Sequence, residues 1–212
     1  MRHGHRPVPH IALTFDDGPD PVWTPLVLEA LSETRATFFV VAPRARRFPS
    51  LLADMHDAGH EVAFHCTQHL RHDAMLRGEI DADLRSGLHA LARPARFWRT
   101  PWGVVTPATE AVAGEHGLTL VGWTADTEDW RGDAPAEMLA RVKGDLVSGA
   151  IVLLHDGVGP GAPRDGCAET VALVQPLVSL ARSRGLEPGL LDDLHPPLPD
   201  RNPDYPVSKV RQ

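Results

Sequence analysis

The chain has 212 residues, of which 42% are hydrophobic and 23% are charged. This composition supplies enough apolar side chains for the core of one globular domain, and it excludes a chain that is disordered over its whole length. Its formal net charge of -7 argues against nucleic acid or an anionic membrane surface as the main partner. No apolar run is long enough to span a bilayer, so we expect no membrane insertion. The first residues lack the apolar segment of a secretory signal, so we expect a cytoplasmic protein, or a secreted one whose leader has been removed.

Strand-like and helix-like segments alternate along the chain. Apolar runs typical of buried strands lie at 10–15, 36–41, 61–64, 96–99, 119–123 and 150–154. Helical spacing is found at 24–33, 50–58, 80–92, 107–116, 135–147 and 169–184. This alternation predicts an α/β fold with a parallel sheet, and the short chain favours a reduced or distorted barrel over a regular eight-fold one. We expect one domain over residues 1–195 and a Pro-rich, extended or disordered tail over 196–212.

The first informative segment is an apolar strand that ends in Asp16 and Asp17 and is followed by Gly18-Pro19. Because a strand end need not keep the alternation of side chains, the two carboxylates can reach one cleft from different directions. Adjacent carboxylates are electrostatically unfavourable unless a cation or a proton holds them, which suggests that one binds a metal and the other handles protons. A turn that caps the next helix explains the same tetrapeptide equally well.

The second informative segment leads from a predicted strand into His65, with His69 in the loop or helical turn beyond. Two histidines four residues apart meet on one helix face or across a tight loop, which is the spacing of a metal site. The chain has 12 histidines, so a chance pair at this spacing is common, but its place after a strand favours ligands. We expect His72 to be a surface or supporting residue.

Three later strand ends also carry polar or aromatic side chains. Arg99 offers a charged fork for a carboxylate, and Trp102 offers an apolar wall. Asp129 could orient a histidine, and the Trp130 indole could pack against a sugar ring. His155 stands where a barrel would place a general acid. Each residue alone is compatible with a structural role, but five strand ends meeting at one rim predict a catalytic site.

In this order, the segments resemble the motifs of the polysaccharide deacetylases of carbohydrate esterase family 4, the NodB-homology domain. The matching strings are Thr14-Phe-Asp-Asp-Gly-Pro19, His65-x-x-x-His69, Arg99-x-Pro-Trp-Gly103, Asp126-x-x-Asp-Trp130 and Leu153-Leu-His155. The resemblance covers residues 10–195 and implies a distorted (β/α) barrel with about seven strands. It also implies a metal-dependent hydrolase that removes an acetyl group from an N-acetylated, GlcNAc-type poly- or oligosaccharide.

The resemblance further implies which residues would activate water. Asp17, His65 and His69 would bind a divalent metal ion, most often Zn²⁺, with Co²⁺ and Ni²⁺ as other candidates. Asp16 would be the general base for the water that the metal activates. Arg99 would hold that carboxylate in its ionised form.

The remaining matched residues would serve the leaving group and the acetyl group. His155 would protonate the leaving amine, and Asp129 would keep its imidazole charged and oriented. The backbone amide of Trp102 would help to stabilise the tetrahedral oxyanion. Trp130 and Leu153 would line the pocket that receives the acetyl methyl group.

Two positions depart from the family pattern, and several functions stay open. Cys66 stands where Ser or Thr is usual and could compete as a soft ligand or make the site sensitive to oxidation, and Thr100 stands where a small residue or Pro is common. We expect Cys66 and Cys167 to be free thiols. Alternative substrates are O-acetyl xylan, a cyclic amide or a small N-acetylated metabolite, and a carbohydrate-binding scaffold without activity is a further alternative.

Overall fold

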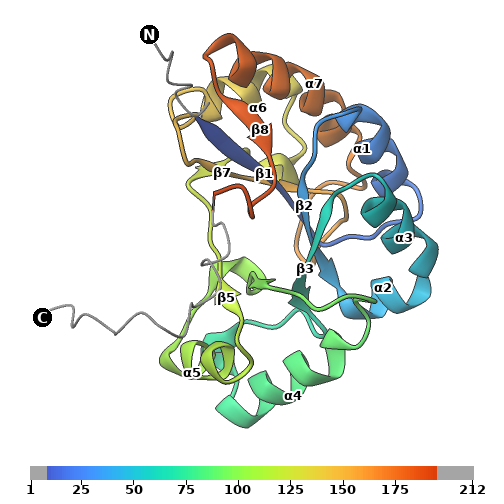
Figure 1. Cartoon of the computed structure of the whole chain (residues 1–212), viewed down its shortest axis with the longest axis vertical. Coiled ribbons are helices and arrows are strands. Elements are labelled where there is room, and N and C mark those ends of the chain that lie inside the picture. Colours follow the sequence, from blue (N-terminus) through green and yellow to red (C-terminus); the bar gives the residue numbers. More distant parts are fainter. Residues whose placement is uncertain (1–8, 195–212) are drawn as a thin grey trace, which may run out of the picture.

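The computed structural model describes residues 9–194, which form one curled sheet and an outer layer of helices (Figure 1). The strands are β1 (His10–Asp16), β2 (Thr37–Val41), β3 (Glu61–Cys66), β4 (Phe97–Trp98), β5 (Thr119–Leu120), β6 (Ala125–Asp126), β7 (Ile151–His155) and β8 (Glu187–Gly189). The helices are α1 (Trp23–Leu31), α2 (Ala42–Arg47), α3 (Pro49–Asp57), α4 (Arg77–Leu88), α5 (Pro107–Glu115), α6 (Pro135–Val142) and α7 (Ala168–Ser183).

The sheet is parallel throughout, and seven of its strands follow the order β5-β4-β3-β2-β1-β7-β6. The eighth, β8, pairs with the first residues of β1. Within residues 9–194 no pairing joins β5 to β6, so the sheet is a curled half-barrel. Successive helices contact one another around its outside in the order α6, α7, α1, α3, α2, α4, α5 (Figure 1). The predicted distorted barrel of about seven strands is confirmed.

The alternation of side chains in β1 separates two apolar clusters. Ile11, Leu13 and Phe15 face outward into the large core beneath the helices, where full burial of such a side chain stabilises the fold by about 1.5–3 kcal/mol. The inner face holds a smaller cluster, whose buried members are Ala12, Phe39, Ala63, Phe97, Val121 and Leu191. Farther along the same face, β1 carries Thr14 and Asp16. The interior of the sheet is therefore apolar at one end and polar at the carboxyl end.

Proline and glycine mark several element boundaries. Pro107 and Pro135 are the first residues of α5 and α6, where a missing amide hydrogen leaves no helical bond unmade. Gly59 and Gly185 follow α3 and α7 with φ of 78° and 72°, in the left-handed region that glycine enters without steric cost.

Short elements are where the sequence prediction differs from the structure. Helix α2 follows β2 directly and was not predicted, because its Arg-rich six residues show no apolar period. Strands β6 and β8 were not predicted either, since two or three residues are too few for an alternating pattern. The strand predicted at 119–123 is reduced to β5, and the helix predicted at 135–147 ends at Val142.

The other expectations concern the C-terminal tail and domain boundary, membrane crossing and the two cysteines. The tail predicted at 196–212 and the domain boundary at 195 lie outside the described residues and stay predictions. None of the helices within 9–194 combines the length and the apolar character that crossing a membrane requires. Cys66 and Cys167 are buried free thiols, as expected.

Candidate active site

A cavity of about 300 Å³ lies where the carboxyl ends of the central strands meet. Its lining residues are Asp16, Asp17, His65, His69, Trp102, Trp123, Asp126, Trp130, Leu153, His155, Gly157, Gly159, Pro160, Gly161, Ala162 and Arg164. Eight of the ten predicted site residues are among them. The other two, Arg99 and Asp129, are fully buried and contact Asp16 and His155 from behind the cavity wall.

Asp17, His65 and His69 converge on one point of this cavity. Asp17 has a φ of 73°, so the chain turns sharply after β1 and its carboxylate leaves the alternation of the strand. Its Oδ1 lies 3.5 Å from Nε2 of His65 and 3.2 Å from Nε2 of His69, and the two imidazole nitrogens are 3.4 Å apart. The three ligand atoms therefore form a compact cluster.

The chemistry of these three side chains fits a divalent metal ion. Nδ1 of His65 donates to the carbonyl oxygen of Arg99 at 2.7 Å, so Nε2 presents its lone pair to the cluster. Oδ1 of Asp17 is buried and has no hydrogen-bond partner among the described residues. Burial alone would raise the pKa of Asp17, but its contacts with His65 and His69 outweigh burial and lower that pKa well below the usual value. One carboxylate and two imidazoles are a ligand set typical of zinc sites that keep an open position.

Asp16 faces a different partner. Arg99 is fully buried, and its Nη1 donates to Oδ1 of Asp16 at 2.9 Å and to Oγ1 of Thr14 at 2.8 Å. Its Nη2 donates to the Gly122 carbonyl at 2.8 Å, and the guanidinium lies 4.2 Å from the centre of the Phe39 ring. These bonds compensate for the burial of both charges. Asp16 and Asp17 thus differ in environment, one held by a cation and the other grouped with imidazoles.

His155 lies beside Asp16, since the two residues are register partners in β7 and β1. Its Nδ1 donates to Oδ1 of Asp129 at 2.7 Å, and its main-chain amide donates to Oδ2 at 2.9 Å. Burial lowers the pKa of His155, but the Asp129 carboxylate more than offsets it and raises the pKa to about 9. At neutral pH the imidazole is therefore protonated and can act as an acid.

Two residues that sequence reasoning missed hold Asp129 from its other side. Oγ1 of Thr170, in the first turn of α7, donates to Oδ2 of Asp129 at 2.6 Å. Nη1 of Arg164 donates to the Asp129 carbonyl at 2.9 Å and to the Thr170 hydroxyl at 2.7 Å. Burial alone would raise the pKa of Asp129, but His155 and Arg164 lower it to about 2. Neither missed residue belongs to a local sequence pattern, so no signal in the sequence pointed to them.

We predict that Asp129→Asn moves the alkaline limb of the pH–rate profile to lower pH by about two units or more. Without the carboxylate, burial of His155 dominates, and its pKa falls from about 9 to its ordinary 6.5 or below. A group that must be protonated to act then loses activity as pH rises through neutrality. The profile of kcat between pH 5 and 10 measures this shift, with Asp133→Asn, whose carboxylate pairs with Arg141, as the control. An unchanged alkaline limb would remove Asp129 from the role of setting the charge on His155.

The remaining site predictions have mixed outcomes. The ring of Trp102 packs edge-on against His69 at 4.4 Å between centroids, and its side chain is exposed at the rim. His72 is outside the cluster, as expected, but it is buried rather than on the surface, with Nδ1 3.0 Å from the Thr109 hydroxyl. Cys66 is 1% exposed, and burial raises the pKa of its thiol, which argues against ligation or ready oxidation.

Known proteins are similar to this chain in sequence and in fold. The family model described as polysaccharide deacetylase matches residues 3–121. A chitooligosaccharide deacetylase from Bradyrhizobium sp. is 34% identical over 87% of this chain and 90% of its own length. A peptidoglycan-N-acetylglucosamine deacetylase from Bacillus cereus is 34% identical over 69% of this chain and 72% of its own. A family 4 carbohydrate esterase from Streptomyces lividans, solved in complex with acetate, matches with a TM-score of 0.77 at 28% identity over 85% of this chain and 92% of that one. This chain therefore belongs to the polysaccharide deacetylases of carbohydrate esterase family 4, the NodB-homology family that its motifs resemble.

Proposed function

We propose that the protein is a metal-dependent hydrolase that removes the acetyl group from an N-acetylated, GlcNAc-type poly- or oligosaccharide. The observation that carries the proposal is that one cavity brings together three kinds of group. These are a candidate ligand cluster (Asp17, His65, His69), the carboxylate of Asp16 and the imidazole of His155. The curated relatives support it, since they are named as deacetylases of chitooligosaccharides and of peptidoglycan N-acetylglucosamine.

The residues around the cluster have separate parts in the proposed reaction. A divalent metal held by the cluster would polarise the acetyl carbonyl and lower the pKa of water. Arg99 occupies Oδ1 of Asp16, so Oδ2 is the oxygen that would take the proton from the attacking water. The water oxygen bonds to the carbonyl carbon, and the backbone amide of Trp102 would donate to the oxyanion that forms.

Breakdown of the tetrahedral intermediate requires a proton on the leaving nitrogen. Asp129 occupies Nδ1 of His155, so Nε2–H is the donor that would protonate the amine as the carbon–nitrogen bond breaks. Acetate and the free amino sugar are the products.

Apolar side chains would position the substrate. Leu153 is 4% exposed and, together with Trp130, would receive the acetyl methyl group. Trp102 and Trp130 are 46% and 39% exposed at the rim, where flat aromatic faces can stack on sugar rings.

Acetate release from a substrate panel tests the proposed function. We expect release from chitooligosaccharides or peptidoglycan in the presence of zinc or cobalt, with one free amine formed per acetate, and loss of activity with a chelator. Small N-acetyl amino sugars and acetylxylan complete the panel. Release from acetylxylan alone would replace the amide substrate by an ester. Bound metal without release from any substrate would favour a binding scaffold.

We also predict that His155→Ala lowers the rate by about 10²–10⁴-fold while metal affinity stays close to that of the wild type. The reason is that the imidazole donates a proton and lies outside the ligand cluster. Metal content measured on the same sample separates the two effects. Loss of metal in this variant would make His155 a ligand instead of the acid.

A further inference from the structure

One side chain of α4 accepts hydrogen bonds from the main chain between His65 and His69. Asp83 is 7% exposed, and its carboxylate accepts two consecutive backbone amides of that segment. Oδ2 accepts from the Thr67 amide at 2.9 Å, and Oδ1 accepts from the Gln68 amide at 2.6 Å. Each carboxylate oxygen thus fixes one peptide group between His65 and His69.

Further contacts fix the same segment to α4. The Thr67 hydroxyl donates to the main-chain carbonyl of Asp83 at 2.7 Å. One turn later, Gly87 lies so close that a Cβ there would meet the Thr67 hydroxyl and the Phe64 ring, each at 2.4 Å. The Gly87 backbone therefore lies directly against the Thr67 and Phe64 side chains, which leaves the segment little freedom to shift.

The two histidines differ in how they are held. His65 lies in β3 and is oriented by its bond to the Arg99 carbonyl. His69 lies beyond the strand, and its buried Nδ1 has no hydrogen-bond partner among the described residues. Its ring is positioned by the edge contact with Trp102 and by the path of the chain that carries it. The direction of that path is set at Thr67 and Gln68.

We propose that Asp83 is a positioning residue for the metal centre, because it holds the segment that carries His69 at the place where its imidazole meets Asp17 and His65. This inference rests on the proposed metal site. Groups that orient a ligand without touching the metal typically change metal affinity by about 10–100-fold when they are removed.

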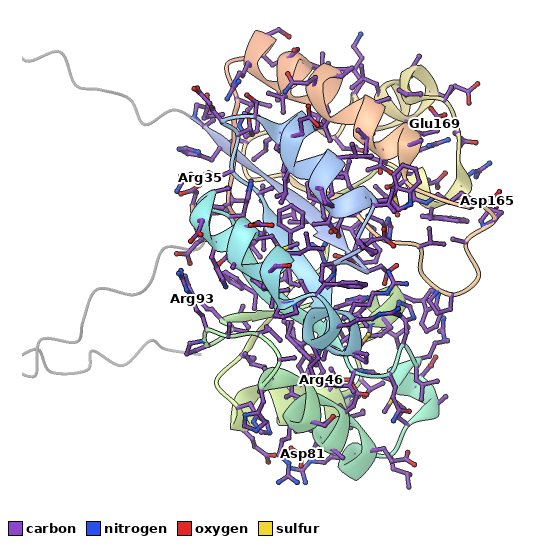
Figure 2. The ribbon with its side chains drawn as sticks, turned by 90° about the vertical axis from the view of Figure 1, so that its right-hand side faces the viewer. Arg35, Arg46, Asp81, Arg93, Asp165 and Glu169 are labelled. Carbon is purple, nitrogen blue, oxygen red and sulfur yellow. The ribbon has the colours of Figure 1, made fainter. Side chains whose placement is uncertain are left out.

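The test is the isosteric variant Asp83→Asn. Asparagine keeps one oxygen acceptor but turns an NH₂ group toward a backbone N–H, so one of the two bonds is lost and two donors face each other. The matched control is Asp81→Asn on the same helix. Asp81 lies on the outer surface of α4 (Figure 2) and accepts from Nε2 of His116 at 2.7 Å. The Asp81→Asn variant therefore makes the same chemical change at a residue that does not contact the segment that carries His69.

Zinc affinity of the metal-free proteins, measured by competition with a chromophoric chelator, is the readout, and thermal unfolding of the same samples reports stability. We expect Asp83→Asn to weaken zinc binding by about 10–100-fold. We expect Asp81→Asn to stay within about twofold of the wild type. A role in stability alone would lower the unfolding temperature of Asp83→Asn and leave zinc affinity unchanged, which would overturn the inference.

A second variant keeps the test decisive if metal-free Asp83→Asn does not fold. Thr67→Val removes the hydroxyl that donates to the Asp83 carbonyl and accepts from Oγ of Ser86, both on α4, and we expect it to weaken zinc binding by a smaller factor in the same direction. Unchanged zinc affinity in a folded Thr67→Val protein would then overturn the inference. Failure of the wild type itself to bind zinc would overturn the proposed metal site, which is a different result from a wild type that binds and an Asp83 variant that binds equally well.

Discussion

Asp17→Asn is expected to abolish metal binding and acetate release together. Asp17 is the only carboxylate of the cluster, and both imidazole nitrogens lie within 3.5 Å of its Oδ1. An amide there offers a neutral oxygen in place of an anionic one. Losing a metal that supplies several kcal/mol of transition-state stabilisation lowers the rate by about 10³-fold or more.

Metal content and acetate release measured on one sample check this prediction. Asp20→Asn is the matched control, because Oδ1 of Asp20 accepts from the Val22 and Trp23 amides just before and at the start of α1, and the amide oxygen of asparagine can accept the same two bonds. The control should retain full metal and full activity. An Asp17→Asn protein that keeps one metal ion per chain would contradict the assignment of Asp17 as a ligand.

Asp16→Asn is expected to give the opposite combination, with metal retained and turnover reduced by about 10²–10⁴-fold. Asparagine cannot take a proton from water, yet its oxygen can still accept from Arg99. The variant leaves a buried guanidinium without its anion, and breaking a buried pair typically costs about 3–5 kcal/mol of stability. We therefore expect the unfolding temperature of this variant to fall as well.

The comparison with Asp17→Asn supplies the control for Asp16→Asn. The same chemical change at neighbouring positions should remove metal in one case and proton transfer in the other. Normal acetate release by a folded Asp16→Asn protein would exclude Asp16 as the base.

The sequence predicted the parts of this site that follow from strand periodicity. Asp16 and His155 each end a strand on the inner face, and parallel strands end at the same rim, so their convergence could be inferred from pattern alone. Arg99 follows β4 at the same rim, which is why its pairing with Asp16 could be expected. The motif order then linked these strand ends to one family.

The supporting residues could not be predicted, because nothing local marks them. Asp83 is one acidic residue in a helix with several, and Arg164 is one cation in an irregular segment. Arg44 lies in the unpredicted helix α2, where it donates to the carbonyls of Asp17 at 2.7 Å and Val158 at 2.9 Å. Each of these contacts joins segments far apart in the chain, and only the packing of helices on the sheet brings them together.

The positive φ angles at the site could not be predicted from the sequence either. Asp17 and Trp102 both adopt positive φ, at 73° and 54°, although neither is glycine. Such conformations are unfavourable for residues with a Cβ and persist where the surrounding structure fixes them. They direct one carboxylate toward the histidines and one indole to the rim.

Zinc titration of metal-free protein with acetate release as the readout tests the central claim most directly. With a chitooligosaccharide substrate, we predict that the rate rises linearly with added zinc and stops rising at one equivalent per chain. Acetate release at the full rate by protein shown to be free of metal would contradict the claim that this cavity is a metal-dependent deacetylase site.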